Sequence, residues 1–328
     1  MNFLSDIKFD FMGKRKIAMV FSLTLILLSL GALITRGLNF GLDFTGGTVV
    51  VVHFDNSVEV PTVRDSLHQQ GFADAVVKNF GSSKDIEITL PPIESIDEAV
   101  DAVVDQKEAA SGETDEAKLS NEILSVLQQV DSSARISKAD FVGSQVGDEL
   151  VEQGSLAMLY AIIGILMYVT FRFEWRFSLG AVAALVHDVV ITAGIFSAFP
   201  VEFDLTVLAA LLAVIGYSLN DTIVVFDRVR ENFRMIRKTP AAEVMNISIG
   251  QTLSRTVITS LTTMLVLIAL YVFGGALINS FAFALIIGVV VGTYSSIFVA
   301  STTTLALGIS REDLIPVEKE GADLSHIP

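Results

Sequence analysis

Six long apolar runs constrain the fold of this chain more than any other feature. The first covers residues 17–34 without a charged side chain, and five more lie near 155–171, 178–199, 205–227, 252–273 and 277–304. Each run holds about the 20 residues of helix that cross a bilayer. We therefore predict a polytopic α-helical membrane protein with six transmembrane helices.

The first run, residues 17–34, could instead be a cleaved signal peptide. Its apolar stretch is long for that role, and no good small-residue cleavage site follows it. We expect an uncleaved span at 17–35. The composition agrees with a membrane protein, because 52% of the residues are hydrophobic. The chain has no cysteine, which excludes disulfides, thiolate metal sites and a cysteine nucleophile.

The basic residues predict the orientation of the spans. Lys and Arg precede the first run, separate the second from the third and separate the fourth from the fifth, whereas the short loops at the other side have none. Because short cytoplasmic loops carry the excess of Lys and Arg, both termini, 1–16 and 305–328, should be cytoplasmic. Residues 36–154 should then lie on the opposite, periplasmic side, and residues 155–304 should form spans two to six.

Residues 36–155 are acidic, with 22 acidic and 8 basic side chains. Such a charge argues against a nucleic-acid partner. Strands are expected at 46–54 and 134–142, a hairpin at 73–90, and helices near 61–71 and 95–130. The order β-α-β-β-α-β predicts a small ferredoxin-like α+β domain between spans one and two. Its link to the second span, 143–155, contains glycines that favour either a hinge or a plain connector.

Asp221 is the most unusual residue inside the apolar runs. It lies seven residues before Arg228, or about 10 Å along the helix from the cytoplasmic edge, with Asn220 beside it. Burying a carboxylate in a membrane is costly, so it needs a reason. A titratable carboxyl can carry an ion through the membrane. The alternative is a structural carboxylate that bonds to a neighbouring helix.

Asp188 and Arg255 are the other candidates for an ion relay. Asp188 follows His187 near the middle of the third run, and this pair is a candidate to contact the fourth span. A purely structural role is equally open for Asp188 and is favoured for His187. Arg255 is the basic residue of the fifth run, and we expect it to form an ion pair with Asp221 at a similar depth. The alternative is that it reaches the headgroups.

Several other patterns bear on function. The chain has no phosphate-binding P-loop and no HExxH zinc motif, so we expect no enzyme activity, cofactor or metal. An intramembrane protease built on two facing aspartates, Asp188 and Asp221, is a weak alternative. Gly288 and Gly292 form a GxxxG spacing, which favours close helix packing.

Four stretches of the chain resemble the SecF family, the smaller subunits of SecDF protein-export complexes. They are GLNFGLDFTGGT (37–48), GYSLNDTIVVFDRVREN (216–232), QTLSRTVITSLTT (251–263) and FGGALINSFAFALIIGVVVGTYSSIFVAS (273–301). The resemblance implies one half of a transporter of the RND superfamily in the bacterial inner membrane. It places Asp221 and Arg255 on the family's ion-coupling positions.

The same resemblance implies the partners. SecD would supply the other half, and the pair would use the proton-motive or sodium-motive force to assist export through SecYEG, on the pathway driven by SecA. Unfolded preproteins would be met on the periplasmic side. The alternative function is a structural subunit without ion coupling. A small-molecule efflux pump is disfavoured, because six spans and one outer domain make only half a transporter.

Overall fold

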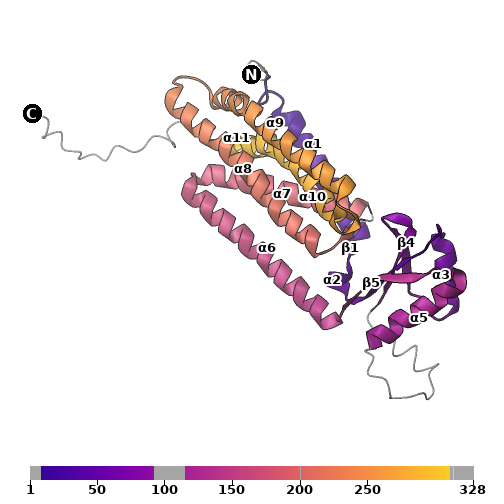
Figure 1. The fold of residues 1–328 in the computed structure, drawn as a ribbon. Helices are drawn as coiled ribbons and strands as arrows, with labels where there is room; N and C mark the ends of the chain where they lie inside the picture. Colours follow the sequence, from indigo (N-terminus) through magenta and orange to yellow (C-terminus); the bar gives the residue numbers. More distant parts are fainter. Residues whose placement is uncertain (1–8, 92–114, 200, 311–312, 314–328) are drawn as a thin grey trace, which may run out of the picture.

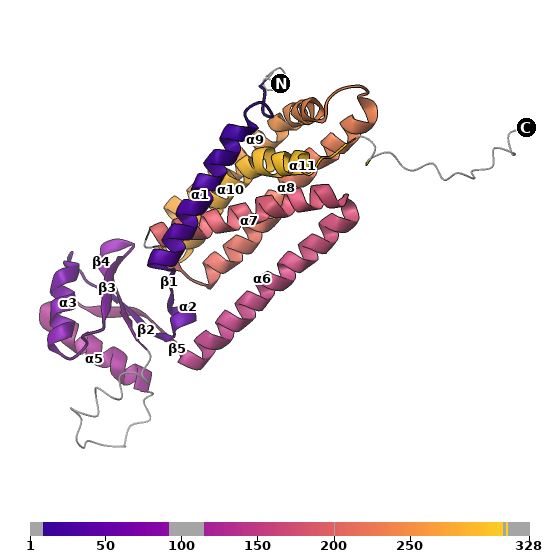
Figure 2. The same ribbon diagram turned by 180° about the vertical axis from the view of Figure 1, so that it is seen from behind.

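The computed structural model describes residues 9–91, 115–199, 201–310 and 313, which form a helical bundle with a small α/β domain at one end (Figures 1 and 2). Within these residues, six helices are long and apolar enough to cross a membrane. They are α1 (Arg15–Arg36), α6 (Ser144–Arg172), α7 (Trp175–Ala198), α8 (Leu205–Met235), α9 (Ala241–Phe273) and α10 (Ala276–Ser295), the last continuing through the π-helical turn η2 (Ser296–Ala300) into α11 (Ser301–Ala306). The predicted fold class is confirmed.

The α/β domain has the predicted order of elements. They are β2 (Gly47–His53), α3 (Val60–Gln69), β3 (Val76–Phe80), β4 (Ser82–Leu90), α5 (Asp115–Val130) and β5 (Arg135–Val142). The strands are antiparallel in the order β3-β4-β2-β5, with β2 in the middle. This is the ferredoxin-like arrangement. The helix expected over 95–130 is seen from Asp115 on, and the rest of that prediction lies outside the described residues.

The core of this domain follows from alternating apolar residues on its strands. Val50 and Val52 of β2 are fully buried, as are Ile86 and Ile88 of the neighbouring β4. The two helices cover this face with side chains at helical spacing, namely Val63 and Leu67 of α3 and Ile123 and Leu127 of α5. The domain therefore has a hydrophobic core of its own, separate from that of the bundle.

The bundle has three central helices and three peripheral ones. Half of the most apolar stretch is buried in α7, in α8 and in the α10–α11 helix, against 11% in α1, 17% in α9 and 6% in α6. Helix α6 diverges from the others toward the α/β domain (Figures 1 and 2). Residues buried on the central helices are thus shielded within this chain, whereas α1, α6 and α9 leave wide faces open.

The link at 143–155 is the first part of α6 and not a hinge or a loop. Its Glu, Gln and Leu residues form helices readily, and this outweighs a cost of about 1 kcal/mol for each glycine. Gly147 has a packing role instead. An added Cβ there would lie 3.1 Å from the carbonyl oxygen of Phe44, so the glycine lets α6 approach the short helix α2 (Leu42–Thr45).

A short parallel pairing joins the α/β domain to the bundle. Strand β1 (Asn39–Phe40) pairs with β6 (Glu202–Phe203), which lies between α7 and α8. The backbone N–H of Gly41 adds a 2.8 Å hydrogen bond to Phe203. Gly47 has a φ of 123°, and a Cβ there would lie 2.3 Å from a carbonyl oxygen of β4, so only glycine fits. The glycine-rich entry segment is therefore the seam between the two parts.

Candidate functional site

Helix α8 carries Asp221, and its start is fixed by two carboxylates. Asp204 is the N-cap residue and accepts a 2.8 Å hydrogen bond from the backbone N–H of Val207. Asp43, from α2, accepts one of 3.0 Å from the N–H of Leu205. Both satisfy N–H groups that a helix start leaves free, and their charge suits the positive end of the helix dipole. The start of helix α8 is therefore held by the segment that joins the α/β domain to the bundle.

Asp221 lies inside the bundle, with only 3% of its surface exposed. Its Oδ2 is buried and has no hydrogen-bond partner among the residues that the structure describes. Such an atom is rare, because most buried polar groups are hydrogen-bonded. Asp221 is thus a membrane carboxyl with capacity to bind a proton or a cation.

Thr256 of α9 lies at the level of Asp221. Tyr217 of α8 donates a 3.4 Å hydrogen bond to Ser260 of α9, and the two helices are antiparallel across a short loop. Asp221 is one turn after Tyr217 and Thr256 one turn before Ser260, so helical geometry sets them at the same level. The Oγ1 of Thr256 is also buried and without a partner within the described ranges. Two unpaired oxygens thus lie at one level of the bundle.

Arg255 does not form the predicted ion pair. No contact within 4.0 Å joins it to Asp221 in the described part of the chain, although its charge acts on Asp221 through space. The two side chains lie on different faces of their helices: Asp221 is buried inside the bundle, whereas Arg255 lies on an exposed face of α9. Asn220 is likewise exposed, on α8. The structure brings these three residues to one region of the bundle but not into direct contact.

Asp188 has quite different surroundings. It is fully buried on α7, and its Oδ1 lies 2.9 Å from Nδ1 of His187. Its Oδ2 accepts hydrogen bonds from Ser218 of α8, at 2.5 Å, and from Ser295 of α10, at 2.7 Å. The predicted contact with the fourth span therefore exists and is made through Ser218. Both carboxylate oxygens of Asp188 are satisfied within this chain.

The GxxxG pair packs against α8 of the same chain. An added Cβ at Gly288 would lie 2.0 Å from Val214, and one at Gly292 would lie 3.1 Å from the Cβ of Ser218. Close helix packing is therefore the role of both glycines. They bring α10 near enough to α8 for Ser218 and Ser295 to share one carboxylate.

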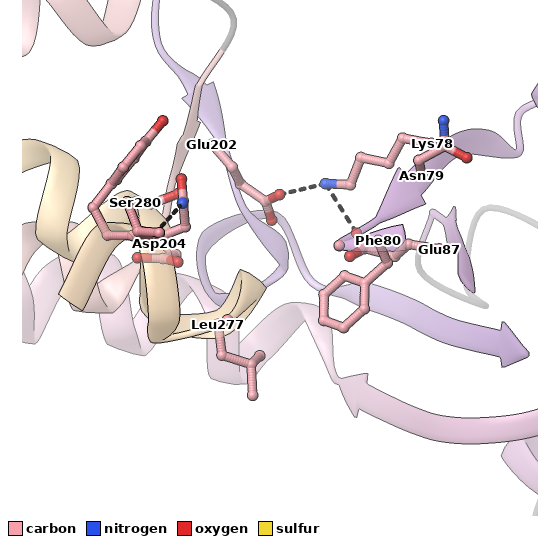
Figure 3. A pocket seen from close by; sticks show the side chains of 13 residues that line it. Lys78, Asn79, Phe80, Glu87, Glu202, Asp204, Leu277 and Ser280 are labelled. Carbon is pink, nitrogen blue, oxygen red and sulfur yellow. Dashed lines mark hydrogen bonds and ion pairs between the residues drawn. The ribbon is translucent and has the colours of Figure 1, made fainter. Parts of the chain in front are cut away.

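A second polar region lies where the α/β domain faces the bundle. Lys78 of β3 forms ion pairs with Glu202 of β6 and, at 2.9 Å, with the buried Glu87 of β4 (Figure 3). They border a cleft of about 470 Å³ whose other side includes Asp204 and Ser280. Glu202 is two residues before the N-cap of α8, so this contact connects the α/β domain to the helix that carries Asp221.

The two glutamates keep Lys78 charged. Burial pushes the pKa of Lys78 down, but the hydrogen bonds and charges of Glu202 and Glu87 together raise it above its ordinary value of 10.5. Lys78 therefore keeps its positive charge, and the contact its ion pairs, at neutral pH.

Sequence reasoning selected Asp221, Asn220, Asp188 and Arg255 but missed the hydroxyl residues close to the two aspartates. Ser218, Ser295 and Thr256 are hydroxyl residues in apolar helices, where such residues are common. Lys78, Glu202 and Asp43 were missed because ion pairs and caps between distant segments leave no spacing signal. Among the described residues, no three His, Asp or Glu side chains lie close enough together to hold a metal ion.

Comparison with known proteins identifies the family. Residues 122–310 match the model of the family "Protein export membrane protein SecD/SecF, C-terminal", and residues 31–58 match the "SecD/SecF GG Motif". Curated relatives named protein translocase subunit SecF include that of Vibrio alginolyticus, 50% identical over 97% of this chain and 96% of its own, and that of Pseudomonas aeruginosa, 46% identical over 94% of both.

Two solved structures have a similar fold. The crystal structure of SecDF from Thermus thermophilus, described as a translocon-associated membrane protein, matches 94% of this chain with 38% identity and a TM-score of 0.80. SecDF in a super-membrane-facing form matches 92% with the same identity and a TM-score of 0.65. This chain spans 40% and 39% of the lengths of those chains.

Proposed function

The chain belongs to the SecD/SecF family of protein-export membrane proteins, as a SecF-type translocase subunit, and we propose that it couples an ion gradient to preprotein export. It would do so together with SecD, in the bacterial inner membrane with both termini in the cytoplasm. The pair would assist SecYEG, on the pathway on which SecA acts, and draw unfolded preproteins out on the periplasmic side. The chain would carry out no covalent chemistry of its own.

The unpaired carboxylate oxygen of Asp221 carries this proposal. A buried carboxylate in a membrane bundle is energetically costly. A carboxylate with a purely structural role is stabilised by hydrogen-bond donors, as Asp188 is by Ser218 and Ser295, whereas Oδ2 of Asp221 has none among the described residues. Asp221 instead lies at the level of Thr256, also unpaired, with the charge of Arg255 nearby. Binding and release of a proton or a sodium ion would change the electrostatic balance between α8 and α9.

The energy available is sufficient for such a switch. Moving one charge through 100 mV yields about 2.3 kcal/mol. Because about 1.4 kcal/mol corresponds to a tenfold change, this shifts a two-state equilibrium by roughly fifty-fold. A single coupled ion per cycle could therefore change the arrangement of the helices.

An exposed polar face on α8 and α9 supports SecD as the partner. Asn220 and Arg255 are exposed at membrane depth, where contact of a charged side chain with lipid is unfavourable. A partner helix that covers this face would remove the exposure and lie next to Asp221. The longer SecDF chains agree with a partner of this kind, since this chain spans only 40% of the first.

The α/β domain is placed to respond to α8. It contacts the start of this helix through the β1–β6 pairing, through Asp43 and through Lys78. A movement of α8 driven by ion binding would therefore be passed to the domain that lies on the export side.

The test is Asp221→Asn, reconstituted with SecD, SecYEG and SecA in vesicles. Asparagine keeps the size of the side chain and removes the titratable group. We expect export driven by ATP alone to continue and the acceleration by an ion gradient to disappear. The matched control is Asp227→Asn, on the same helix, since Asp227 is half-exposed and pairs with Arg172 at 2.8 Å. Full gradient-driven export by Asp221→Asn would refute ion coupling at this residue.

A structural subunit is the second candidate function, favoured by the close packing at Gly288. In that case Asp221→Asn would be tolerated, whereas Gly288→Leu would prevent assembly. Measuring the recovery of the complex and its export separately for both variants distinguishes the two functions.

A further inference from the structure

We propose that Asp188 is a positioning residue that clamps α7, α8 and α10 together and so sets the place of Asp221, and that it does not itself carry the ion. This inference rests on the proposed function. It assigns different tasks to the two membrane aspartates, although both have the same chemistry.

Three side chains contact the carboxyl group of Asp188. Ser218 and Ser295 both donate to Oδ2, and His187 lies against Oδ1. Two hydroxyl donors and a ring nitrogen at 2.5–2.9 Å satisfy a carboxylate that is fully buried on α7. Hydrogen bonds to a charged group are among the stronger ones in proteins. Binding an ion at Asp188 would require that these contacts break first.

The two serines lie at positions that link Asp188 to the surroundings of Asp221 and to the end of α10. Ser218 is three residues before Asp221, so both lie on the same side of α8. Ser295 ends α10, and the π-helical turn η2 begins at the next residue. Such turns are frequent at functional sites because they interrupt the regular helix. The clamp therefore fixes the rotation of α8 close to Asp221 and meets α10 where that helix is irregular.

A third set of contacts links the clamp to α1. The ring of His187 lies 6.0 Å from the ring of Tyr294, at an angle of 30°. The hydroxyl of Tyr294 donates to the carbonyl oxygen of Ala18 at 2.7 Å and lies 3.0 Å from the hydroxyl of Ser22. Helix α1 leads through β1 and α2 into the α/β domain. The network thus connects the helix of Asp221 with the helix that enters this domain.

The experiment compares three variants of the full chain, each reconstituted with SecD, SecYEG and SecA in vesicles. Ser218→Ala with Ser295→Ala removes the two donors and leaves the carboxyl. Asp188→Asn removes the titratable group but keeps the clamp, because a serine hydroxyl can accept from the amide as well as donate. Ser197→Ala is the matched control, a buried serine on α7 whose hydroxyl has no partner among the described residues.

We expect the double serine variant to lose about tenfold in gradient-driven export, the factor that corresponds to one strong hydrogen bond. Asp188→Asn should keep most of this activity, and the control all of it. Export driven by ATP alone and recovery of the complex with SecD should not change. The opposite result, an inactive Asp188→Asn with an active double serine variant, would show that Asp188 carries the ion.

Two further outcomes would also overturn the proposal. One is full gradient-driven export by the double serine variant. The other is a parallel loss of complex recovery and of both kinds of export, which would mean general destabilisation. If Asp221→Asn is inactive while the serine variants are normal, only the clamp is refuted, whereas an active Asp221→Asn refutes the ion-coupling function itself.

A measurement independent of export keeps the clamp testable in that last case. A hydrophobic carbodiimide modifies protonated carboxyl groups inside membranes. We expect it to label Asp221 and spare Asp188 in the parent chain, and the double serine variant to change the rate at Asp221. An unchanged rate at Asp221, or labelling of Asp188 in the parent chain, would contradict the clamp.

Discussion

Two aspartates lie inside the same bundle, and their neighbours decide what each can do. Asp188 has three hydrogen-bond partners and belongs to the packing of α7, α8 and α10. Asp221 is 3% exposed, and one of its oxygens is unpaired in the described structure. Because an unsatisfied buried polar group is unfavourable, the Asp221 site gains most from binding an ion.

Thr256 offers a residue-scale prediction. If its hydroxyl is a second oxygen of the ion site, Thr256→Val should raise the ion concentration needed for half-maximal gradient-driven export by about tenfold, with the maximal rate preserved. Thr256→Ser should restore the parent value. The control is Thr302→Val, since the Oγ1 of Thr302 is also buried and unpaired in the described part of α11. An equal effect of both valine variants would contradict a specific role for Thr256.

The functional role of charged residues in the apolar helices was predictable from the sequence, but that of the hydroxyl residues was not. Asp221, Asp188 and Arg255 stand out because each is costly in a membrane. Ser and Thr are not costly, since they often bond to their own helix, as Thr259 does with the carbonyl oxygen of Arg255. The direction of Arg255 also escaped prediction, because spacing gives depth in the membrane but not the face of a helix that a partner covers.

At the scale of elements, α8 is the centre of the bundle. It packs against α10 through the glycine spacing, against α7 through Ser218 and against α9 through Tyr217. Asn232 adds hydrogen bonds to Ser248 at 2.8 Å and to Gln251 at 2.9 Å near the C-terminal end of α8. A movement of α8 is therefore shared by its neighbours.

Gly288→Leu should disrupt this packing. A side chain at this position would overlap with Val214, and overpacking of a close-packed site costs about 1–3 kcal/mol or more. We expect lower recovery of folded chain and a lower midpoint of thermal unfolding in detergent. Gly164→Leu, on α6, is the control because nothing lies within 4 Å of an added Cβ there. Equal unfolding midpoints for the two variants would show that the α8–α10 contact tolerates a large side chain.

Asp43 gives a prediction about the start of α8. Asp43→Ala removes one acceptor from a helix N-terminus, a change that typically costs about 1 kcal/mol. The unfolding midpoint should fall slightly, and hydrogen exchange at the amide of Leu205 should become faster. Asp65→Ala, on the exposed face of α3, is the control for both measurements. No change at Leu205 would mean that Asp204 caps the helix alone.

Periodicity predicted the elements better than their ends. The apolar runs located all six spans because lipid requires about 20 apolar residues. The helices extend further, to Met235 in α8 and back to Ala241 in α9, since polar residues continue a helix once packing has started it. The strands of the α/β domain followed from apolar segments bounded by glycine and other turn residues, whereas the β1–β6 pairing joins two-residue strands far apart in the chain and has no local signal.

At the scale of the whole molecule, Lys78 couples the α/β domain to the bundle. Its pair with Glu202 is partly exposed, 42% and 34% of the side chains, and such pairs contribute at most about 1 kcal/mol. A contact of this strength can open and close during a cycle.

Reversing the charges of this pair tests the coupling. Lys78→Glu sets a third carboxylate beside Glu87 and Glu202, so gradient-driven export should fall. Adding Glu202→Lys should restore it, because the new lysine can reach both glutamates. Lys138→Glu is the control, since Lys138 pairs only with Asp140 of its own strand among the contacts within the described residues. If Glu202→Lys does not restore export in the Lys78→Glu variant, the Lys78–Glu202 ion pair is not required for export.

The same contact should respond to salt but not to pH near neutrality. The pKa of Lys78 is raised above 10.5, so its stabilising charge is fully present below this value and is lost only as the pH rises through the higher folded pKa. Salt screens a partly exposed pair. Asn79→Cys and Ser280→Cys place two labelling sites beside the same cleft, in a chain with no other cysteine, and leave Lys78 and Glu202 intact. The distance between probes attached to these cysteines should increase with salt and stay constant across neutral pH. A marked change near pH 7 would point to a different titrating group.

The central claim is that Asp221 couples an ion gradient to export. The most direct measurement is export by vesicles on which a proton gradient alone or a sodium gradient alone is imposed, with the parent chain and with Asp221→Asn. We predict that one of the two gradients accelerates export with the parent chain and that neither does so with the variant. Equal acceleration of the parent chain and of Asp221→Asn would contradict the account.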